Sequence, residues 1–480
     1  MSKILCSRIR YIVPFMFESE ASYDSLIHTI AELPEWTLEN MGESELEQDL
    51  YQTILDSFTM DLDQSNIGCS FLFQNEENQN LIIDFKYTGA ESDLDVSIVN
   101  LGTYLFRTGI GFLWYELKLP ENMDTELLIR FQNEFKELSY ARFVHLNERQ
   151  TRYTFELEEK THKGLLMGHW IADLLYKMPF TVSYFAQRKD PLVNDRKIPD
   201  KALLFNYVIF EKGTDKSAYL QEIYHLNNGY NARYAVNETF ENQLVKPFKD
   251  AYFCATTHGC GYYAVPNDSN MNFYLHTKRK RVMSDYFILD ILALYQAYSV
   301  LRFTNKMEQD LAAESERYMT DSSEILNKLK TLSTQINVFL VKSVYSSVSH
   351  ISHHNEFYDY LMRAYRVREN IEGLTIGLES LQRLQEARER ERTEKIEQEK
   401  SQEQERSDNR LNIGLGLISI LALISAISDG DAAFELIVKM LHLPESMKIV
   451  FDWGMLILVF AVAFIAIKSI RLYIAQSKKK

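Results

Sequence analysis

The sequence predicts a protein of class α+β/α: a mixed α/β domain, then a bundle of long helices with a charged stalk, and finally a two-helix transmembrane hairpin. Three observations predict this order. Short strand-like apolar runs alternate with amphipathic stretches as far as about residue 280. No proline occurs between Pro266 and Pro444, which favours long helices over that part of the chain. Long uncharged apolar runs occur only close to the C-terminus.

The size and charge of the chain limit its class. With 480 residues it is too long for one hydrophobic core, so we expect at least two packed units. Its net charge of −15 argues against a broad surface for nucleic acid, and we expect no nucleic acid polymer as a partner. Its cysteines have no paired CxxC spacing, so we expect free thiols in a reducing cytosol at Cys6, Cys69, Cys254 and Cys260.

Residues 1–280 are expected to form a cytoplasmic α/β domain that senses or binds a ligand. We expect a first strand over residues 9–17, and a helix over residues 44–58 that begins with a capping box of Ser44 and Glu47. Further strands are expected over residues 69–74, 81–87, 96–101, 153–157, 182–186 and 203–210, and further helices over residues 125–138 and 163–178.

Residues 284–385 are expected to form a cytoplasmic helical bundle. Ser284 and Asp285 are suited to cap its first helix, which is apolar on nearly all sides as far as Leu301 and should therefore be buried among neighbours. Residues 386–410 follow as a charged stalk with i,i+4 ion pairs between glutamate and a following cation. The density of helix-forming residues favours a solvated helix there; a flexible linker is the alternative.

Two apolar runs are predicted to cross a membrane, at residues 411–428 and 451–474. The first is long enough to reach about 27 Å as a helix, which is barely the thickness of a bilayer core. Residues 429–450 would form the outer loop, and residues 475–480 a basic tail that the positive-inside rule places in the cytoplasm. An even number of spans then places both termini in the cytoplasm, in a multi-pass protein of the inner (plasma) membrane.

A stripe of small and polar residues marks the first predicted span. Asn412, Gly416 and Ser419 fall within a narrow arc of the helix, and Asp429 follows at its outer end. These residues either pack helices together or line a pore. Because one two-helix hairpin cannot enclose a pore, lining a pore requires a homo-oligomer.

Several cations and glycines before the helical bundle are candidates for ligand binding. A phosphate-bearing ligand needs cations to offset its negative charge. The candidate cations are Arg107, Arg233, Lys278, Arg279 and Arg281. Gly109 and Gly111 follow the first of them, and we interpret these glycines first as a tight hairpin turn. We interpret the basic run 276–281 first as a solvated linker, with contact to a phosphate-bearing ligand or an anionic lipid as the alternative.

The common catalytic and metal-binding patterns are absent from the sequence. It contains no GxxxxGK[ST], HExxH or GxSxG motif and no spaced Cys/His pattern, so we assign no catalytic and no metal-binding residue and do not expect an enzyme. His350, His353 and His354 suggest a metal site, but we interpret them as exposed helix residues. The segment 254–263 is interpreted as a glycine-rich turn flanked by buried aromatic side chains, with a reactive Cys/His pair as the alternative.

The order of parts from Ser284 to Lys480 resembles the CorA family of divalent-cation channels, in which long funnel helices lead through a stalk into two spans and a basic tail. The family's Gly-Met-Asn signature should end the first span, but residues 425–431 read Ser-Ala-Ile-Ser-Asp-Gly-Asp here. The resemblance implies a homo-oligomer, a pentamer or alternatively a tetramer. The missing signature argues against selective uptake of magnesium.

The segment 107–116, Arg-Thr-Gly-Ile-Gly-Phe-Leu-Trp-Tyr-Glu, resembles the CorA-like membrane proteins associated with type III CRISPR systems. This resemblance implies an antiviral effector that permeabilises the membrane when it binds a nucleotide messenger, S-adenosylmethionine joined to AMP or a related adenine nucleotide. A constitutive magnesium or cobalt channel is one alternative function. A membrane-tethered enzyme or scaffold is the second.

Overall fold

A computed structural model describes residues 3–39, 49–59, 66–74, 83–88, 93–145, 165–211, 216–231, 233–236, 240–316, 322–441 and scattered residues between 447 and 471. It divides into two compact units, Met1–Arg383 and Leu384–Lys480. The predicted strand at residues 153–157, the capping box at Ser44 and the basic tail lie outside the described residues.

The first unit is built on one large sheet, which confirms the predicted mixed α/β class. Its strands follow the order β14-β15-β16-β13-β1-β6-β5-β4-β8-β9; β7 and β10 also pair with β1, and β3 pairs with β5 and β2. Strands β11 and β12 form a separate two-stranded sheet. Neighbours are antiparallel except β13 and β16, which run parallel. The strands are β1 Lys3–Glu18, β2 Trp36–Glu39, β3 Gly68–Phe73, β4 Ile83–Thr88, β5 Asp93–Phe106, β6 Ile110–Lys118, β7 Met123–Asp124, β8 Arg142–His145, β9 Leu165–Leu166, β10 Thr181–Tyr184, β11 Gln187–Lys189, β12 Lys197–Pro199, β13 Leu203–Phe210, β14 Val245–Phe248, β15 Ala251–Thr256 and β16 Gly259–Ala264.

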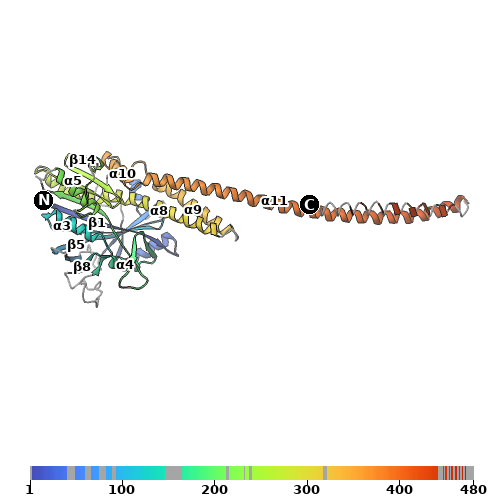
Figure 1. The fold of residues 1–480 in the computed structure, drawn as a ribbon, viewed down its shortest axis with the longest axis horizontal. Helices are drawn as coiled ribbons and strands as arrows, with labels where there is room; N and C mark the ends of the chain where they lie inside the picture. The colour runs from blue at the N-terminus through green and yellow to red at the C-terminus, as the bar shows by residue number, and fades with distance from the viewer. Residues whose placement is uncertain are drawn as a thin grey trace. The chain divides into compact units, whose positions relative to one another are not determined.

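Helices cover the sheet on both faces (Figure 1). One face carries α1 Tyr23–Ala31, α3 Thr125–Phe135, α4 Met167–Tyr176 and α5 Lys216–Asn228. The other carries α2 Gln52–Asp56, α8 Phe287–Glu316, α9 Ser322–Ser343, α10 Ser352–Ala364 and the start of α11 Val367–Leu441. A short helix, α6 Phe240–Gln243, precedes β14, and the stretches η3 Phe273–Lys278, α7 Arg279–Arg281 and η4 Val282–Tyr286 lead into α8.

The central strands are apolar on both sides because the sheet is covered on both faces. In β1, Tyr11 and Val13 belong to the core beneath α3 and α4, whereas Ile12 between them belongs to the core beneath α8. The same alternation divides Leu113 from Phe112 in β6. Successive side chains of a strand point to opposite faces, so one continuous apolar run supplies two cores.

Several predicted elements are confirmed at close bounds. The strand expected at residues 203–210 is β13, the helix expected at 125–138 is α3, and the first strand is longer than expected, from Lys3 to Glu18. The described cysteines are free and buried, as expected of reduced thiols. Residues 254–263 form the β15–β16 hairpin, with the turn at Thr256–Gly259 that the glycines indicated.

The first ten residues of the helix that begins at Phe287 are deeply buried in the first unit. Ten of its residues from Phe287 to Gln296 are all at most 3% exposed, as its apolar surface predicts. Within the described residues one helix is long and apolar enough to cross a membrane, Phe273–Gln309, and 72% of its most apolar window is buried inside the unit. Burial in a protein core therefore accounts for its hydropathy.

The basic run at 276–281 lies in this helix, so the solvated linker that we expected there is wrong. The helix starts at Phe273, before the expected cap at Ser284, and contains two π-helical stretches around Arg279–Arg281. The sheet and the helices expected as a separate bundle pack in one compact unit, because α8 lies against β6 and α10 against β15.

The second unit contains the greater part of α11, which crosses the expected stalk and the first predicted span as one helix. We expected that helix to end at Ser428, but it continues through Asp429 to Leu441. In the second unit the described apolar side chains of α11 are exposed; Ile418 and Leu421 are 63% and 66% exposed. Described residues of the second predicted span are also exposed, including Phe460 and Phe464 at 68% each. The two-span hairpin itself stays a prediction.

A buried ion pair joins β1 to β6 beneath α8. The Arg10 guanidinium donates two hydrogen bonds to Glu116 Oε2, at 3.0 and 2.9 Å, and lies 4.5 Å from the Trp114 ring and 4.2 Å from the Phe287 ring. The two side chains are 11% and 8% exposed. Arg10 therefore depends on this carboxylate for its charge compensation.

We predict that Glu116→Gln lowers the free energy of unfolding by about 3 kcal/mol, because a buried cation is left without its counter-charge. Chemical denaturation of the full chain in detergent measures this. The matched control is Glu391→Gln, which removes the partner of Lys395 from an exposed pair on α11. That change should cost less than about 0.5 kcal/mol. Equal effects for the two variants would contradict the assigned role of Glu116.

Candidate functional site

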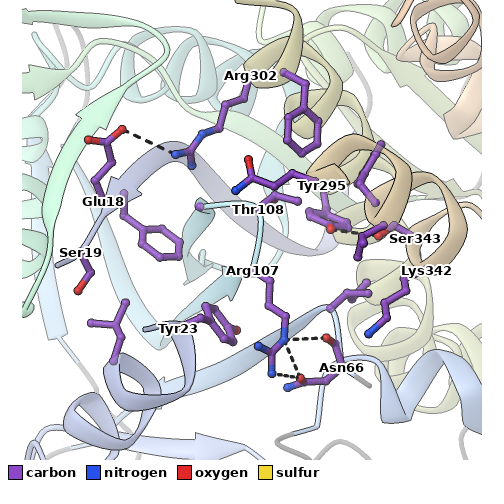
Figure 2. A pocket seen from close by; sticks show the side chains of 18 of the residues that line it. Glu18, Ser19, Tyr23, Asn66, Arg107, Thr108, Tyr295, Arg302, Lys342 and Ser343 are labelled. Carbon is purple, nitrogen blue, oxygen red and sulfur yellow. Dashed lines mark hydrogen bonds and ion pairs between the residues drawn. The ribbon is translucent and has the colours of Figure 1, made fainter. Parts of the chain in front are cut away.

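A cavity of about 660 Å³ lies where the end of β1, the β5–β6 turn and helices α8 and α9 meet (Figure 2). This volume is within the usual range for sites that bind small molecules. The sheet side supplies Glu18, Tyr23 and Asn66, and the turn supplies Arg107 and Gly109. The helices supply the remaining charged and aromatic wall, from Tyr295, Arg302, Phe303, Lys306, Phe339 and Lys342.

The charge of the cavity opposes that of the whole chain, which is −15. Four cations line it, Arg107, Arg302, Lys306 and Lys342, against one acidic lining residue, Glu18. Such a concentration of positive charge in a concave site attracts anions. Guanidinium groups in particular bind phosphate and carboxylate oxygens through paired N–H donors.

Arg107 is held rigidly at the floor of the cavity. Its Nη2 atom lies 2.6 Å from Asp24 Oδ1, and its Nε atom donates to the Asn66 carbonyl at 3.0 Å. The guanidinium also lies 4.7 Å from the centre of the Tyr23 ring. Because these contacts fix the side chain before any ligand arrives, little conformational entropy would be lost on binding.

Arg302 is the least satisfied cation of the cavity. Its side chain is only 18% exposed, and its nearest acidic partner, Glu18, lies 3.8 Å away with a side chain that is 85% exposed. The Nη1 atom is buried and has no hydrogen-bond partner among the described residues. Burial lowers the pKa of Arg302, and Glu18 opposes that shift. A buried donor of this kind is costly unless an acceptor reaches it.

The turn between β5 and β6 shapes the site beneath Arg302. Gly109 has a φ of +75°, and a Cβ atom at this position would lie 1.8 Å from Arg302 Nη1. The tight hairpin turn that we expected for this segment is therefore confirmed, and Gly109 also lines the cavity. Gly111 serves packing instead, because a Cβ atom at this position would lie 2.3 Å from the Phe15 ring.

The helical wall of the cavity is connected to α10 by buried hydrogen bonds. Tyr295 shares a hydrogen bond of 3.1 Å with Ser343 of α9, next to Lys342. The neighbouring Gln296 side-chain amide donates to the Ser343 carbonyl and, at 2.8 Å, to the Tyr358 hydroxyl of α10. A ligand that moves α8 against α9 would therefore also act on α10.

The structure brings only two of the seven predicted ligand residues, Arg107 and Gly109, into this cavity. Arg233 is exposed after α5, and Arg281 is paired with Asp49 at 2.8 Å. Arg279 contacts the Cys6 thiol. Lys278 is 3% exposed and donates to the Tyr286 hydroxyl at 3.0 Å, and burial lowers its pKa to about 8.

Three cations of the cavity were missed in the sequence. Arg302 and Lys306 are four residues apart, so they share one face of α8, and Arg302 interrupts the largely apolar run 287–303 as its one cation. That interruption was a usable signal. Lys342 had none, because only the packing of α9 beside α8 brings it to the site.

The predicted pore residues lie in α11. Asn412, Gly416 and Ser419 are exposed, and the Ser419 hydroxyl donates to the Leu415 carbonyl at 2.8 Å. The backbone of Asp429 is helical, while its side chain lies outside the description. Pore lining stays a prediction for all four.

No protein-family model, curated protein or solved structure matches this chain.

We predict that Gly109→Ala destabilises the first unit by about 1–2 kcal/mol, because alanine disfavours the left-handed turn and its methyl group displaces Arg302. Thermal unfolding of the full chain measures the change. The matched control is Gly373→Ala in α11, where a Cβ atom would meet nothing within 4 Å. That substitution should stabilise by up to about 1 kcal/mol, since alanine favours a helix interior. The assigned geometry is wrong if Gly109→Ala is neutral.

Proposed function

We propose that the chain is a CorA-like, oligomeric membrane effector that an adenine nucleotide messenger opens. In this proposal the ligand is S-adenosylmethionine joined to AMP or a related nucleotide, and the effector acts in type III CRISPR antiviral defence by permeabilising the inner membrane. The resemblance of residues 107–116 motivates the ligand class. The observation that carries the proposal is the buried, unpartnered Nη1 atom of Arg302 in a cavity with three further cations.

The chemistry of the cavity supports a nucleotide over a simple inorganic anion. Its volume of about 660 Å³ exceeds what one phosphate needs. Its cations are suited to phosphate oxygens, and its aromatic and aliphatic wall, from Phe303 and Phe339 among others, is suited to the flat and apolar parts of a nucleoside.

The exposed apolar side chains of the second unit support a membrane location. In the first predicted span Leu411, Ile418 and Leu421 are more than 60% exposed, and in the second Ile457 and Phe460 are 65% and 68% exposed. A soluble protein rarely leaves contiguous apolar surfaces of this kind in water. Lipid and neighbouring subunits would cover them in a homo-oligomer, a pentamer or tetramer by the resemblance.

Gating in this proposal depends on a ligand that contacts both the β5–β6 turn and the helices α8 and α9 across the cavity. A nucleotide that contacts Arg107 from the turn and Arg302 and Lys342 from the helices would change how α8 and α9 sit on the sheet. Such a ligand opens the channel only if it binds the open state more tightly than the closed state, since equal binding shifts no population.

We predict that Arg302→Gln weakens nucleotide binding at least about tenfold, because a charge-assisted hydrogen bond to phosphate contributes roughly 1.5–3 kcal/mol. Isothermal titration of the detergent-solubilised full chain measures this, with the synthetic conjugate of S-adenosylmethionine and AMP as the probe and ATP as the comparison.

The matched control is Arg233→Gln, which removes an exposed arginine that does not line the cavity. It should bind the conjugate within about twofold of the parent. If Arg233→Gln loses affinity while Arg302→Gln does not, the site lies elsewhere. If the parent binds neither nucleotide and vesicles take up magnesium or cobalt unstimulated, the constitutive channel replaces this proposal.

A further inference from the structure

Three buried or half-buried ligand groups from distant parts of the sequence meet at the start of the long helix. Asp49 lies just before α2, Asp285 lies in η4, and His354 lies in α10. One ligand atom from each lies within 4.8 Å of the others, and Asp285 and His354 are each 1% exposed. None of the three lines the basic cavity.

Asp285 presents an oxygen that the described protein does not satisfy. Its Oδ1 atom accepts from the Ser284 hydroxyl at 3.5 Å, while its Oδ2 atom is buried with no hydrogen-bond partner among the described residues. Burial, and then the charge of Asp49, raise the pKa of Asp285 to about 6, while the charge of Arg281 and hydrogen bonds from the Asp49 backbone and Ser284 oppose that shift. An orphaned carboxylate oxygen at full burial calls for a bound cation or proton.

The hydrogen bonds around His354 leave its other nitrogen available. The Ser349 hydroxyl donates to the Asp49 carbonyl, so its oxygen accepts from the Ile351 amide at 3.0 Å and from His354 Nδ1 at 3.2 Å. This arrangement places the ring proton on Nδ1 and the lone pair on Nε2. Burial and the neighbouring cations lower the pKa of His354 to about 3, so the ring is neutral. Neutral imidazole with a bonded second nitrogen is the usual form of a metal ligand.

We propose that Asp49, Asp285 and His354 bind a divalent transition-metal ion, with Zn²⁺ or Mn²⁺ as the class of ion. Two carboxylate oxygens and one imidazole nitrogen form a ligand set that such ions accept. Ligands about 2.1 Å from one ion lie at most about 4.2 Å apart, so small side-chain rotations close the observed spacing.

The cations near the cluster leave room for the ion. Arg281 Nη1 lies 2.8 Å from Asp49 Oδ2, which leaves the other carboxylate oxygen to the metal. Lys278 is held away by its hydrogen bond to Tyr286 and by three rings within 5.3 Å of its ammonium group. His353 and His350 are further positive influences on the cluster only when protonated. The bound ion would join η4, α10 and the segment before α2.

The test is metal binding by the full-length chain in detergent, after chelator treatment and dialysis, with Zn²⁺ alone and Mn²⁺ alone as probes. Elemental analysis should find one ion per chain for at least one of the two metals. Titration calorimetry should show at least tenfold weaker binding for Asp285→Asn and for His354→Gln. It should show about tenfold weaker binding for Ser349→Ala, because this change removes the hydrogen bond that orients the His354 ring.

Asp290→Asn is the matched control. Asp290 is also fully buried in this helix, and its Oδ2 atom has no hydrogen-bond partner among the described residues. Its Oδ1 atom accepts from the Tyr365 hydroxyl at 2.7 Å, and the residue lies outside the cluster. It should bind the metal like the parent. The site is refuted if the parent binds neither ion stoichiometrically, if Asp285→Asn and His354→Gln retain parental affinity, or if Asp290→Asn loses as much. If Asp285→Asn does not fold, as judged by circular dichroism, the affinity of His354→Gln decides.

Discussion

The first unit depends on the burial of α8 against the sheet. This helix is long and apolar enough to cross a membrane, and its first ten residues, Phe287 to Gln296, are all buried among neighbouring elements. The sheet, α9, α10 and the first turns of α11 supply those neighbours. Stacking of Phe106 on Tyr295 at 4.0 Å and contact of Arg10 with Phe287 at 4.2 Å tie the helix to β5 and β1. Displacing α8 would expose much of one core at once.

Both candidate sites follow from the position of this helix. Arg302 and Lys306 line the basic cavity near its C-terminal half, while Asp285 joins the metal-ligand cluster just before its start. Between them Gln296 and Asp290 reach Tyr358 and Tyr365 through buried hydrogen bonds. One rigid element therefore carries the ligand wall at one end and the cluster at the other, and its contacts lead to α10 and to the start of α11.

The parts predicted from the sequence are those in which a local pattern determines the outcome. The continuous apolar run at 203–210 is β13, the burial of the helix after Tyr286 follows from its composition, and Arg107 and Gly109 share a short turn. The predictions that failed concern residues whose surroundings depend on tertiary packing. Lys278 looks solvated in sequence, but three aromatic rings from separate elements enclose it. His354 was expected to be exposed but is 1% exposed, because the Tyr286 ring at the end of η4 packs against it with a centroid distance of 4.8 Å.

The most direct test of nucleotide-gated permeabilisation is dye leakage from lipid vesicles that contain the full-length chain. Addition of the conjugate of S-adenosylmethionine and AMP should release the dye, and vesicles without it should stay sealed. Vesicles with Arg302→Gln should need at least about tenfold more conjugate for the same leakage, because a buried phosphate contact is lost. Leakage that is equal with and without the conjugate, or sealed vesicles in which the conjugate binds at saturation, would contradict the proposed function.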